Sequence, residues 1–265
     1  MPDNASVSFA EALASFRPVT LEEMDSVKLM NRVDSKYVTD QATLLEILHD
    51  AQASGYRVLV TDGNRINPYD SMYFDTDDLK MFQDHRNGKL VRQKVRTRTY
   101  LSSGLAFLEI KRKNNKGRTN KKRTRISVDE FSDFRTDSDA NEYLARHSAF
   151  TKDQLSPVLE TQFNRITLVN PSMTERLTID TSLVFKNART GISATLKNAV
   201  IIELKQDGRA SSRMKEIFMA HRVKPLRVSK YCIAVTLTEP DIRPGRFRLK
   251  VRKIEKIINQ NITAK

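Results

Sequence analysis

The 265-residue sequence contains no tryptophan, a single cysteine and only four histidines. The lone cysteine, Cys232, excludes an internal disulfide, and its apolar surroundings (YCIAVTL) indicate a buried thiol rather than a nucleophile. The histidines show none of the spacings that are typical of zinc ligands. These absences argue against disulfide-stabilised, thiol-dependent and histidine–metal classes of protein.

Long apolar runs are also missing from the sequence. No segment approaches the ~20 consecutive apolar residues that a membrane-spanning helix requires. The N-terminus lacks the basic region followed by an apolar core that marks a secretory signal. We therefore expect a soluble, cytoplasmic protein.

Positive charge is abundant instead. Lysine and arginine together number 46 against 32 aspartates and glutamates, which gives a net charge of +14. An excess of this size favours an anionic partner such as nucleic acid, an anionic membrane surface or a phosphate-rich small substrate.

The charge pattern is clearest in residues 89–100, KLVRQKVRTRTY. Alternate residues of a β-strand share a face, so one face would carry Arg92, Lys94, Arg96, Arg98 and Tyr100. Four neighbouring cations on one pleat repel one another unless an anion lies between them. For one strand alone, a solvated face of an ordinary sheet explains the pattern as well.

Other segments repeat this design of one charged and one moderately apolar face. Strands are expected at residues 31–40, 56–60, 69–76, 105–113, 121–128, 158–169, 175–185 and 199–206. Helices are expected at 6–30, with a Thr20–Glu23 capping box, at 41–53 after the N-cap Asp40, at 77–88, at 139–155 and at 209–222. Residues 229–238 fit a helix or a strand.

Charged faces that turn inward would let the helices cover the apolar exterior of the strands. The sequence thus predicts an α+β fold with a closed antiparallel β-barrel and a charged lumen. We expect one domain over residues 1–240 and a basic tail over 241–265. Such a lumen suits a polyphosphate chain, and a few carboxylates in it suit Mg²⁺ or Mn²⁺ shared with phosphate.

One ordered set of motifs runs along the chain: Asp34-Ser-Lys36-Tyr37, Tyr73-Phe-Asp75-Thr76, Arg96-x-Arg98, Glu109-x-Lys111, Phe163-Asn164-Arg165, Arg176 before Ile179-Asp180-Thr181, Glu203-x-Lys205 and Ser229-Lys230-Tyr231. In this order the set resembles the VTC (vacuolar transporter chaperone) polyphosphate polymerase domain, one of the triphosphate tunnel metalloenzymes, and the resemblance covers roughly residues 20–235. The resemblance implies transfer of the γ-phosphate of ATP to a growing polyphosphate chain, with Mn²⁺ or Mg²⁺.

The resemblance also implies roles for individual residues. The expected catalytic residues are Lys36, Arg96, Arg98, Arg165 and Lys230. The expected phosphate-binding residues are Lys111, Arg176, Lys205, Arg227, Ser229 and either Lys122 or Arg123, where the alignment is ambiguous by one. Glu203 is the expected metal ligand and Glu109 a weaker candidate. Phe163 departs from the family pattern because a tyrosine, with its hydroxyl, is usual there.

Three carboxylates have other interpretations. Asp34 and Asp75 are expected to be structural, pairing with neighbouring cations. Asp180 suits either an ion-pair partner or an acid that acts on the site through a neighbouring residue, without touching the substrate.

Alternative functions remain open from the sequence. The same tunnel could hydrolyse tripolyphosphate or nucleoside triphosphates, or the protein could be a non-catalytic polyanion-binding module. Expected partners are ATP, polyphosphate and pyrophosphate; nucleic acid is not expected because Tyr100 is the only aromatic residue on the basic strand face.

The tail, with Arg243 to Lys256 interleaved with apolar residues, has several interpretations. It could contact an anionic membrane or a membrane partner protein at the inner face of a membrane, or be a packing helix or a disordered tail.

Overall fold

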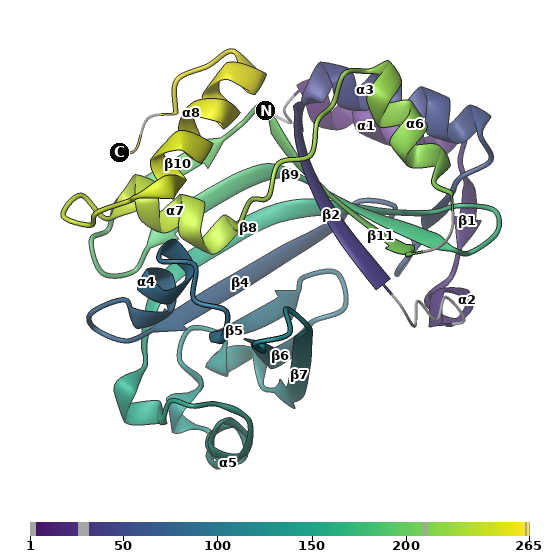
Figure 1. Cartoon of the computed structure of the whole chain (residues 1–265). Helices are drawn as coiled ribbons and strands as arrows, with labels where there is room; N and C mark the ends of the chain where they lie inside the picture. Colours follow the sequence, from purple (N-terminus) through teal and green to yellow (C-terminus); the bar gives the residue numbers. More distant parts are fainter. Residues whose placement is uncertain (1–3, 26–31, 209–210, 263, 265) are drawn as a thin grey trace.

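The computed structural model describes residues 4–25, 32–208, 211–262 and 264, and Figure 1 shows its elements. The strands are β1 (Arg17–Val19), β2 (Arg32–Asp40), β3 (Arg57–Leu59), β4 (Asn67–Asp75), β5 (Arg92–Tyr100), β6 (Leu105–Lys113), β7 (Thr119–Ile126), β8 (Ser156–Val169), β9 (Glu175–Asn187), β10 (Ser193–Leu196) and β11 (Ala199–Asp207). The helices are α1 (Asn4–Ala14), α2 (Leu21–Asp25), α3 (Gln41–Ala53), α4 (Lys80–Arg86), α5 (Ser138–His147), α6 (Arg213–Ala220), α7 (Lys230–Thr238) and α8 (Arg246–Ile258).

Local signals in the sequence set several of these boundaries. The Asp40 carboxylate accepts a hydrogen bond from the backbone N–H of Thr43 at 2.8 Å, so α3 begins where its N-cap was expected. Thr20 and Glu23 form the predicted capping box ahead of α2, with bonds of 2.8 and 3.2 Å. The strand predicted at residues 105–113 coincides with β6.

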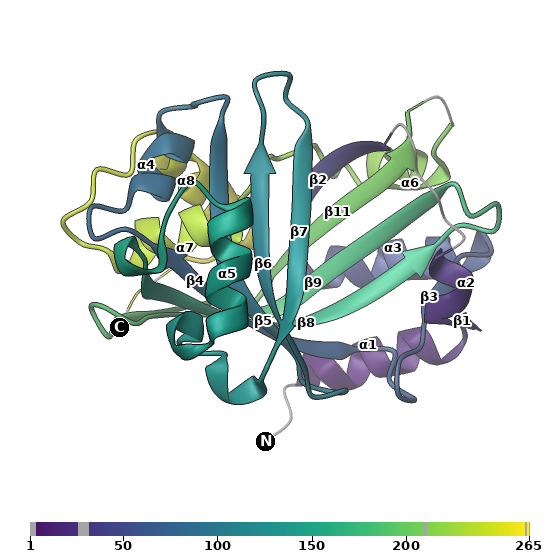
Figure 2. The same ribbon diagram turned by 90° about the horizontal axis from the view of Figure 1, so that it is seen from below.

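All the strands belong to one sheet, which is strongly curved (Figures 1 and 2). Its main path is antiparallel in the order β2-β11-β9-β8-β4-β5-β6-β7, while β10 pairs with β9, and β3 pairs with β1 and β8. The prediction of an antiparallel α+β fold is confirmed, but that of a closed barrel is wrong. Within the described residues, β2 and β7 are the ends of this path and do not pair with each other.

The segment between α6 and α7 explains why the sheet stays open at β2. The backbone N–H of Leu226 donates to the carbonyl of Lys36 at 2.7 Å, and Pro225 forms an antiparallel bridge with Tyr37. This segment therefore covers the free edge of β2, where a closing strand would have to pair.

The two faces of the sheet pack differently. Apolar side chains of β8, β9 and β11 on the convex face form a core with α1, α3 and α6. The outer face of β5 and β6 packs on α5. One end of the concave face is covered by α7 and α8, which leaves the rest of that face to charged residues.

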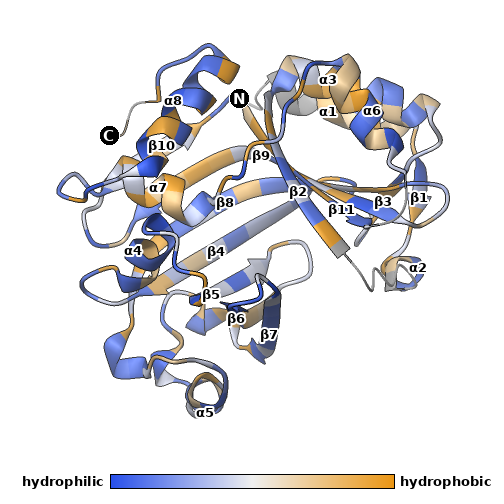
Figure 3. Cartoon of the chain, viewed as in Figure 1, coloured by the Kyte–Doolittle hydropathy of each residue, from blue (hydrophilic) through white to orange (hydrophobic). Residues whose placement is uncertain are grey.

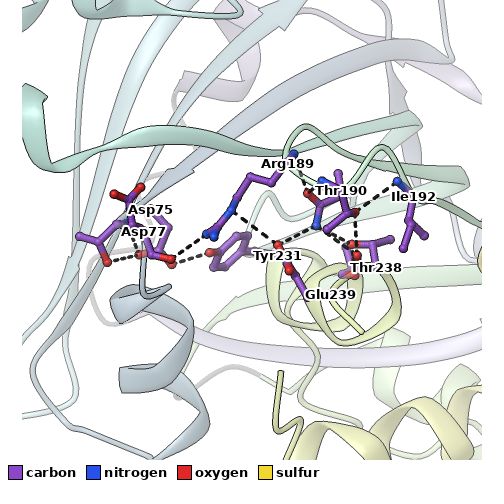
Figure 4. Close-up of polar contacts among 11 residues, drawn as sticks. Asp75, Asp77, Arg189, Thr190, Ile192, Tyr231, Thr238 and Glu239 are labelled. Carbon is purple, nitrogen blue, oxygen red and sulfur yellow. Dashed lines mark hydrogen bonds and ion pairs between the residues drawn. The ribbon is translucent and has the colours of Figure 1, made fainter. Parts of the chain in front are cut away.

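Helix α7 is apolar along most of its length (Figure 3) and is held at both ends (Figure 4). At its start, the Tyr231 hydroxyl donates to Asp75, which also accepts from the backbone N–H groups of the first turn of α4. At its end, the Thr190 hydroxyl donates to the carbonyl of Thr238 at 2.9 Å, and Arg189 lies 3.9 Å from Glu239. Asp75 is thus structural as predicted, although its partners are a phenol and backbone amides rather than cations.

The segment expected as a basic tail folds as α8. Phe247, Val251, Ile254 and Ile258 of this helix are buried in the same core as α7. The apolar residues that suggested membrane contact are therefore mostly used in packing. Within the part of the chain that the structure describes, no helix combines the length and apolarity needed to cross a bilayer.

Candidate functional site

The candidate site is the charged part of the concave face. The register of the strands places Arg96 of β5 beside Tyr73 of β4 and Glu109 of β6, and places Arg123 of β7 beside Glu109. The next row on this face contains Lys94, Lys111 and Lys121. Because Val95 lies between Arg96 and Lys94 and is buried against α5, the cations must face the other way.

Three carboxylates on this face each lie between two cations. Glu109 accepts hydrogen bonds from Arg96 at 2.5 and 2.8 Å and from Lys121 at 2.5 Å. Asp180 on β9 accepts two bonds from Arg165 on β8, at 2.6 and 2.8 Å, and one from Lys230 on α7.

The third carboxylate completes this set. Glu203 on β11 accepts from Lys36 on β2 at 2.8 Å and lies 3.4 Å from Lys205. We call the sets around Glu109, Asp180 and Glu203 the three triads, and each one carries a net positive charge of one.

The triads keep their carboxylates ionised. Burial raises the pKa of Glu109, Asp180 and Glu203, but the neighbouring cations outweigh it and hold each pKa well below its usual range. The opposite effect of burial on lysine shows at Lys230: its pKa falls to about 8 even though Asp180 favours the charged form. The site thus remains positive at neutral pH without a bound anion.

Arg98 lies on the same face of β5 as Arg96 but lacks such a partner among the described residues. The residue is 6% exposed, and its Nε donates to the Ser71 hydroxyl at 3.0 Å. In the described part of the chain no carboxylate forms an ion pair with it, and burial followed by repulsion from Arg96 lowers its pKa to about 10. A buried, unpaired guanidinium with its fork unused is a ready binding group for a phosphate.

Aromatic rings form cation–π contacts with several of these cations. Tyr69 and Phe163 stack with their centroids 5.5 Å apart, and both Arg98 and Arg165 lie within 5.6 Å of each ring. The Lys230 ammonium lies 4.3 Å from the Phe163 centroid. Phe163, at 3% exposure, therefore acts as a shared cation–π platform, a role that needs no hydroxyl.

The start of α7 contributes a second kind of anion-binding group. Ser229 caps this helix, and its hydroxyl accepts a hydrogen bond from Lys94 at 2.6 Å. The helix N-terminus therefore opens beside Lys94 and Lys230, where its dipole adds to their positive potential.

The opposite wall carries further predicted residues. Lys36, Lys205 and Arg176 come from β2, β11 and β9, with Lys205 opposite both Asp34 and Arg176 in the register. Lys111 reaches across from β6: burial lowers its pKa to about 8, and Glu203 is the largest opposing influence. The curvature of the sheet thus brings β6 close enough to β11 for Lys111 and Glu203 to interact electrostatically.

Two predicted residues lie apart from this cluster. Lys122 points to the outer side of β7, since it pairs with Ile110, whose side chain belongs to the core under α5. Its neighbour Arg123 is on the concave side and lies 4.6 Å from the Phe107 centroid, which resolves the ambiguity between these two in placement. Arg227 is exposed at one end of the face, near Lys113 and α8.

The residues fit a divalent cation only in part. Mg²⁺ and Mn²⁺ are often held by one or two carboxylates together with substrate phosphates. Glu203 suits this because its contact with Lys205 is long and its side chain still reaches solvent. Glu109 is 2% exposed and both its oxygens are already bonded, so it suits the role less. No group of three potential ligands among His, Cys, Asp and Glu occurs in the described ranges, so phosphate oxygens would have to complete the coordination.

Several residues of the site were not predicted from the sequence as site residues. Lys94 and Lys121 follow the same alternation as their strands and could have been included on that basis. Tyr73 accepts a hydrogen bond from Arg96 at 3.0 Å, and burial, which raises its pKa, is outweighed by Arg96 and other cations that bring it to about 8. Tyr73 belongs to the motif Tyr73-Phe-Asp75-Thr76, but the sequence assigned no role in the site to this phenol.

Comparisons with known proteins identify the family of the chain. The family model described as "VTC domain" matches residues 31–238. No curated protein matches the chain. Among solved structures, it is similar to a Bacillus halodurans protein provisionally described as an adenylate cyclase (13% identity, TM-score 0.49, 76% of this chain and 96% of that one). It is also similar to a Hippeastrum protein provisionally described as an adenylyl cyclase with a dominant triphosphatase activity (12% identity, TM-score 0.48, 77% and 95%). The family model covers most of the chain and all three triads, and the chain belongs to the VTC-domain family.

Proposed function

We propose that the protein is a polyphosphate polymerase that transfers the γ-phosphoryl group of ATP to the end of a polyphosphate chain. The main support is the concave face itself, which carries three triads with net positive charge together with Arg98, a guanidinium that forms no ion pair with any carboxylate among the described residues. Membership of the VTC-domain family supports the same substrate class.

Phosphoryl transfer makes modest demands on the protein. In this reaction the bond from the γ-phosphorus to the β–γ bridging oxygen breaks, and a bond from that phosphorus to a terminal chain oxygen forms. The terminal phosphate is already ionised, so no general base is needed. Catalysis consists of alignment and neutralisation of charge on the phosphoryl oxygens.

The residues of the face can perform both tasks. Arg98 offers its guanidinium fork, and Lys94, Lys230 and the N-terminus of α7 offer further donors on the adjacent side. The triads hold Arg96 and Arg165 rigidly, so little reorganisation is required when an anion binds. A divalent ion at Glu203 would supply additional neutralisation of phosphate charge.

The aromatic residues of the site argue against nucleic-acid binding. Binding of single strands relies on exposed aromatic rings on which bases stack. Here Phe163 is buried, and the Tyr69 and Phe163 rings lie beneath cations.

Product analysis tests the proposal. Purified protein is incubated with γ-labelled ATP and Mn²⁺, and the products are separated on a gel. We expect a ladder of labelled chains; labelled orthophosphate alone would instead identify a hydrolase, and unchanged ATP a binding module.

Neighbouring residues of β6 provide a matched pair of variants for this assay. Lys111 faces the concave side, whereas Arg112 is exposed on the other side of the same strand. Lys111→Gln should slow chain synthesis about tenfold or more, since one charged contact to phosphate is lost. Arg112→Gln removes the same charge and should match the parent. Equal rates for both variants would contradict the assignment of this face.

A further inference from the structure

The basic lining does not stop at Lys94 and Lys111. The next residues on the same faces of β5 and β6 are Arg92 and Lys113, which lie opposite each other in the register. Arg227 and two residues of α8, Arg246 and Lys250, approach them from the other side. We call these five residues the basic mouth.

The basic mouth is built from separate elements that fix one another. The Arg246 guanidinium donates to the carbonyl of His85 at the end of α4, and the Lys250 ammonium donates to the carbonyl of Arg227. Arg92 donates to the carbonyl of Lys89 at 2.5 Å. Carbonyl groups position these side chains but do not neutralise their charge.

The charges of the mouth lack carboxylate partners. Among the residues that the structure describes, none of the five forms an ion pair. Burial lowers the pKa of Lys113, and repulsion from Arg92 and Arg227 adds to it. Burial likewise lowers the pKa of Lys250, followed by Arg246 and Arg227. Cations of β5, β6, α8 and the segment before α7 thus repel one another at this end of the face.

We propose that the basic mouth is a second phosphate-binding site, which holds the part of a polyphosphate chain that extends beyond the site around Arg98. Naming polyphosphate as the ligand rests on the proposed function. Along β5, Arg92 lies six residues from Arg98, roughly 20 Å in a strand. A triphosphate held at Arg98 would not reach it, whereas a longer chain following the lining would.

A polyphosphate fits the mouth better than a membrane surface does. Arg92 and Lys113 continue the row of cations along the concave faces of β5 and β6. An interfacial helix inserts its apolar side chains into lipid, but Phe247, Val251, Ile254 and Ile258 are buried, and Leu249 is the exposed large apolar residue of α8. Helix α8 lies outside the matched residues 31–238, so the family assignment says nothing about its role.

Binding measurements with two chain lengths test this inference. We compare the affinities for tripolyphosphate and for long-chain polyphosphate by competition against a fluorescent anion at fixed ionic strength. The mouth variant is Lys113→Gln with Lys250→Gln. The control, Arg248→Gln with Arg252→Gln, removes the same charge from the opposite side of α8, since positions 248 and 250 are about 200° apart around the helix.

The parent should bind the long chain more tightly than tripolyphosphate. In the mouth variant this advantage should shrink by about tenfold, because charged contacts to phosphate are lost, whereas the control should keep it. Lys250→Arg should also keep it, and a melting curve for each variant shows that it is folded. An unchanged ratio in the mouth variant, or a parent without preference for the long chain, would overturn the inference.

Other outcomes separate this site from the proposed function. Loss of the advantage in a protein that makes no polyphosphate from ATP would support the mouth and contradict the polymerase. Chain synthesis by a parent without the length preference would do the reverse. A mouth variant that loses only binding to phosphatidylserine vesicles would replace polyphosphate by a membrane and overturn the inference.

Discussion

Replacing Arg98 by methionine should stabilise the ligand-free protein while it weakens triphosphate binding. Burial and the neighbouring cations lower the pKa of Arg98 from 12.5 to about 10, and at ~1.36 kcal/mol per unit this disfavours the charged form by roughly 3 kcal/mol. The folded pKa is depressed and arginine stays protonated at neutral pH, so this cost is present at every pH below about 10.

Methionine removes the charge but fills much of the same space. The loss of the hydrogen bond to Ser71 costs about 1 kcal/mol, which leaves a net gain of roughly 2 kcal/mol. For a protein of this size the melting temperature should rise by about 4–8 °C. Triphosphate affinity should fall tenfold to a hundredfold, since a charged hydrogen bond contributes about 1.5–3 kcal/mol.

Calorimetry measures both quantities on the same samples. Arg98→Lys is the informative companion, because it keeps the charge, loses the fork, and should weaken binding without stabilising the protein. Arg112→Met, on the outer side of β6, should change neither quantity by much. A lower melting temperature for Arg98→Met together with parent-like affinity would refute the view that Arg98 is an unpaired binding group.

Three further predictions concern the triads. Glu203→Gln keeps the shape of the side chain but removes its charge, so Mn²⁺-dependent turnover should fall by orders of magnitude in a folded protein; parent-like turnover at ordinary Mn²⁺ levels would exclude Glu203 as the ligand. Asp180→Asn leaves Arg165 and Lys230 buried without their carboxylate, so unfolding measurements should show a loss of about 3–5 kcal/mol that added tripolyphosphate partly restores. The pKa of Lys230 is about 8, below its unfolded value of 10.5, so triphosphate affinity should fall as pH rises through 8 while the stability of the ligand-free protein gains between pH 8 and 10.5. Titrations at pH 7 and 9.5 check this, and a pH-independent affinity would contradict it.

Local patterns in the sequence predicted the parts of the fold that depend on neighbouring residues. Alternation along β5 correctly placed Arg96 and Arg98 on one face, because Val95 and Thr97, on either side of Arg96, are buried on the other. The N-cap at Asp40 and the bounds of β6 follow from equally local rules.

Long-range features were out of reach for the same reason. Whether the sheet closes depends on the segment around Leu226, which pairs with β2 nearly 190 residues earlier in the chain. Lys36 and Glu203 are 167 residues apart, so their triad could not be read from spacing. Helix α8 is a different case, because its buried residues Phe247, Val251, Ile254 and Ile258 recur at helical spacing. This local pattern favours the packing helix among the alternatives that the sequence left open for the tail.

The most direct test of the central claim is to locate bound tripolyphosphate by crystallography in the presence of Mn²⁺. The account predicts phosphate density on the concave face, within hydrogen-bond distance of the Arg98 guanidinium and close to Lys230. Density confined to the outer surface, for example along Arg248 and Arg252 of α8, with none near Arg98, would contradict it.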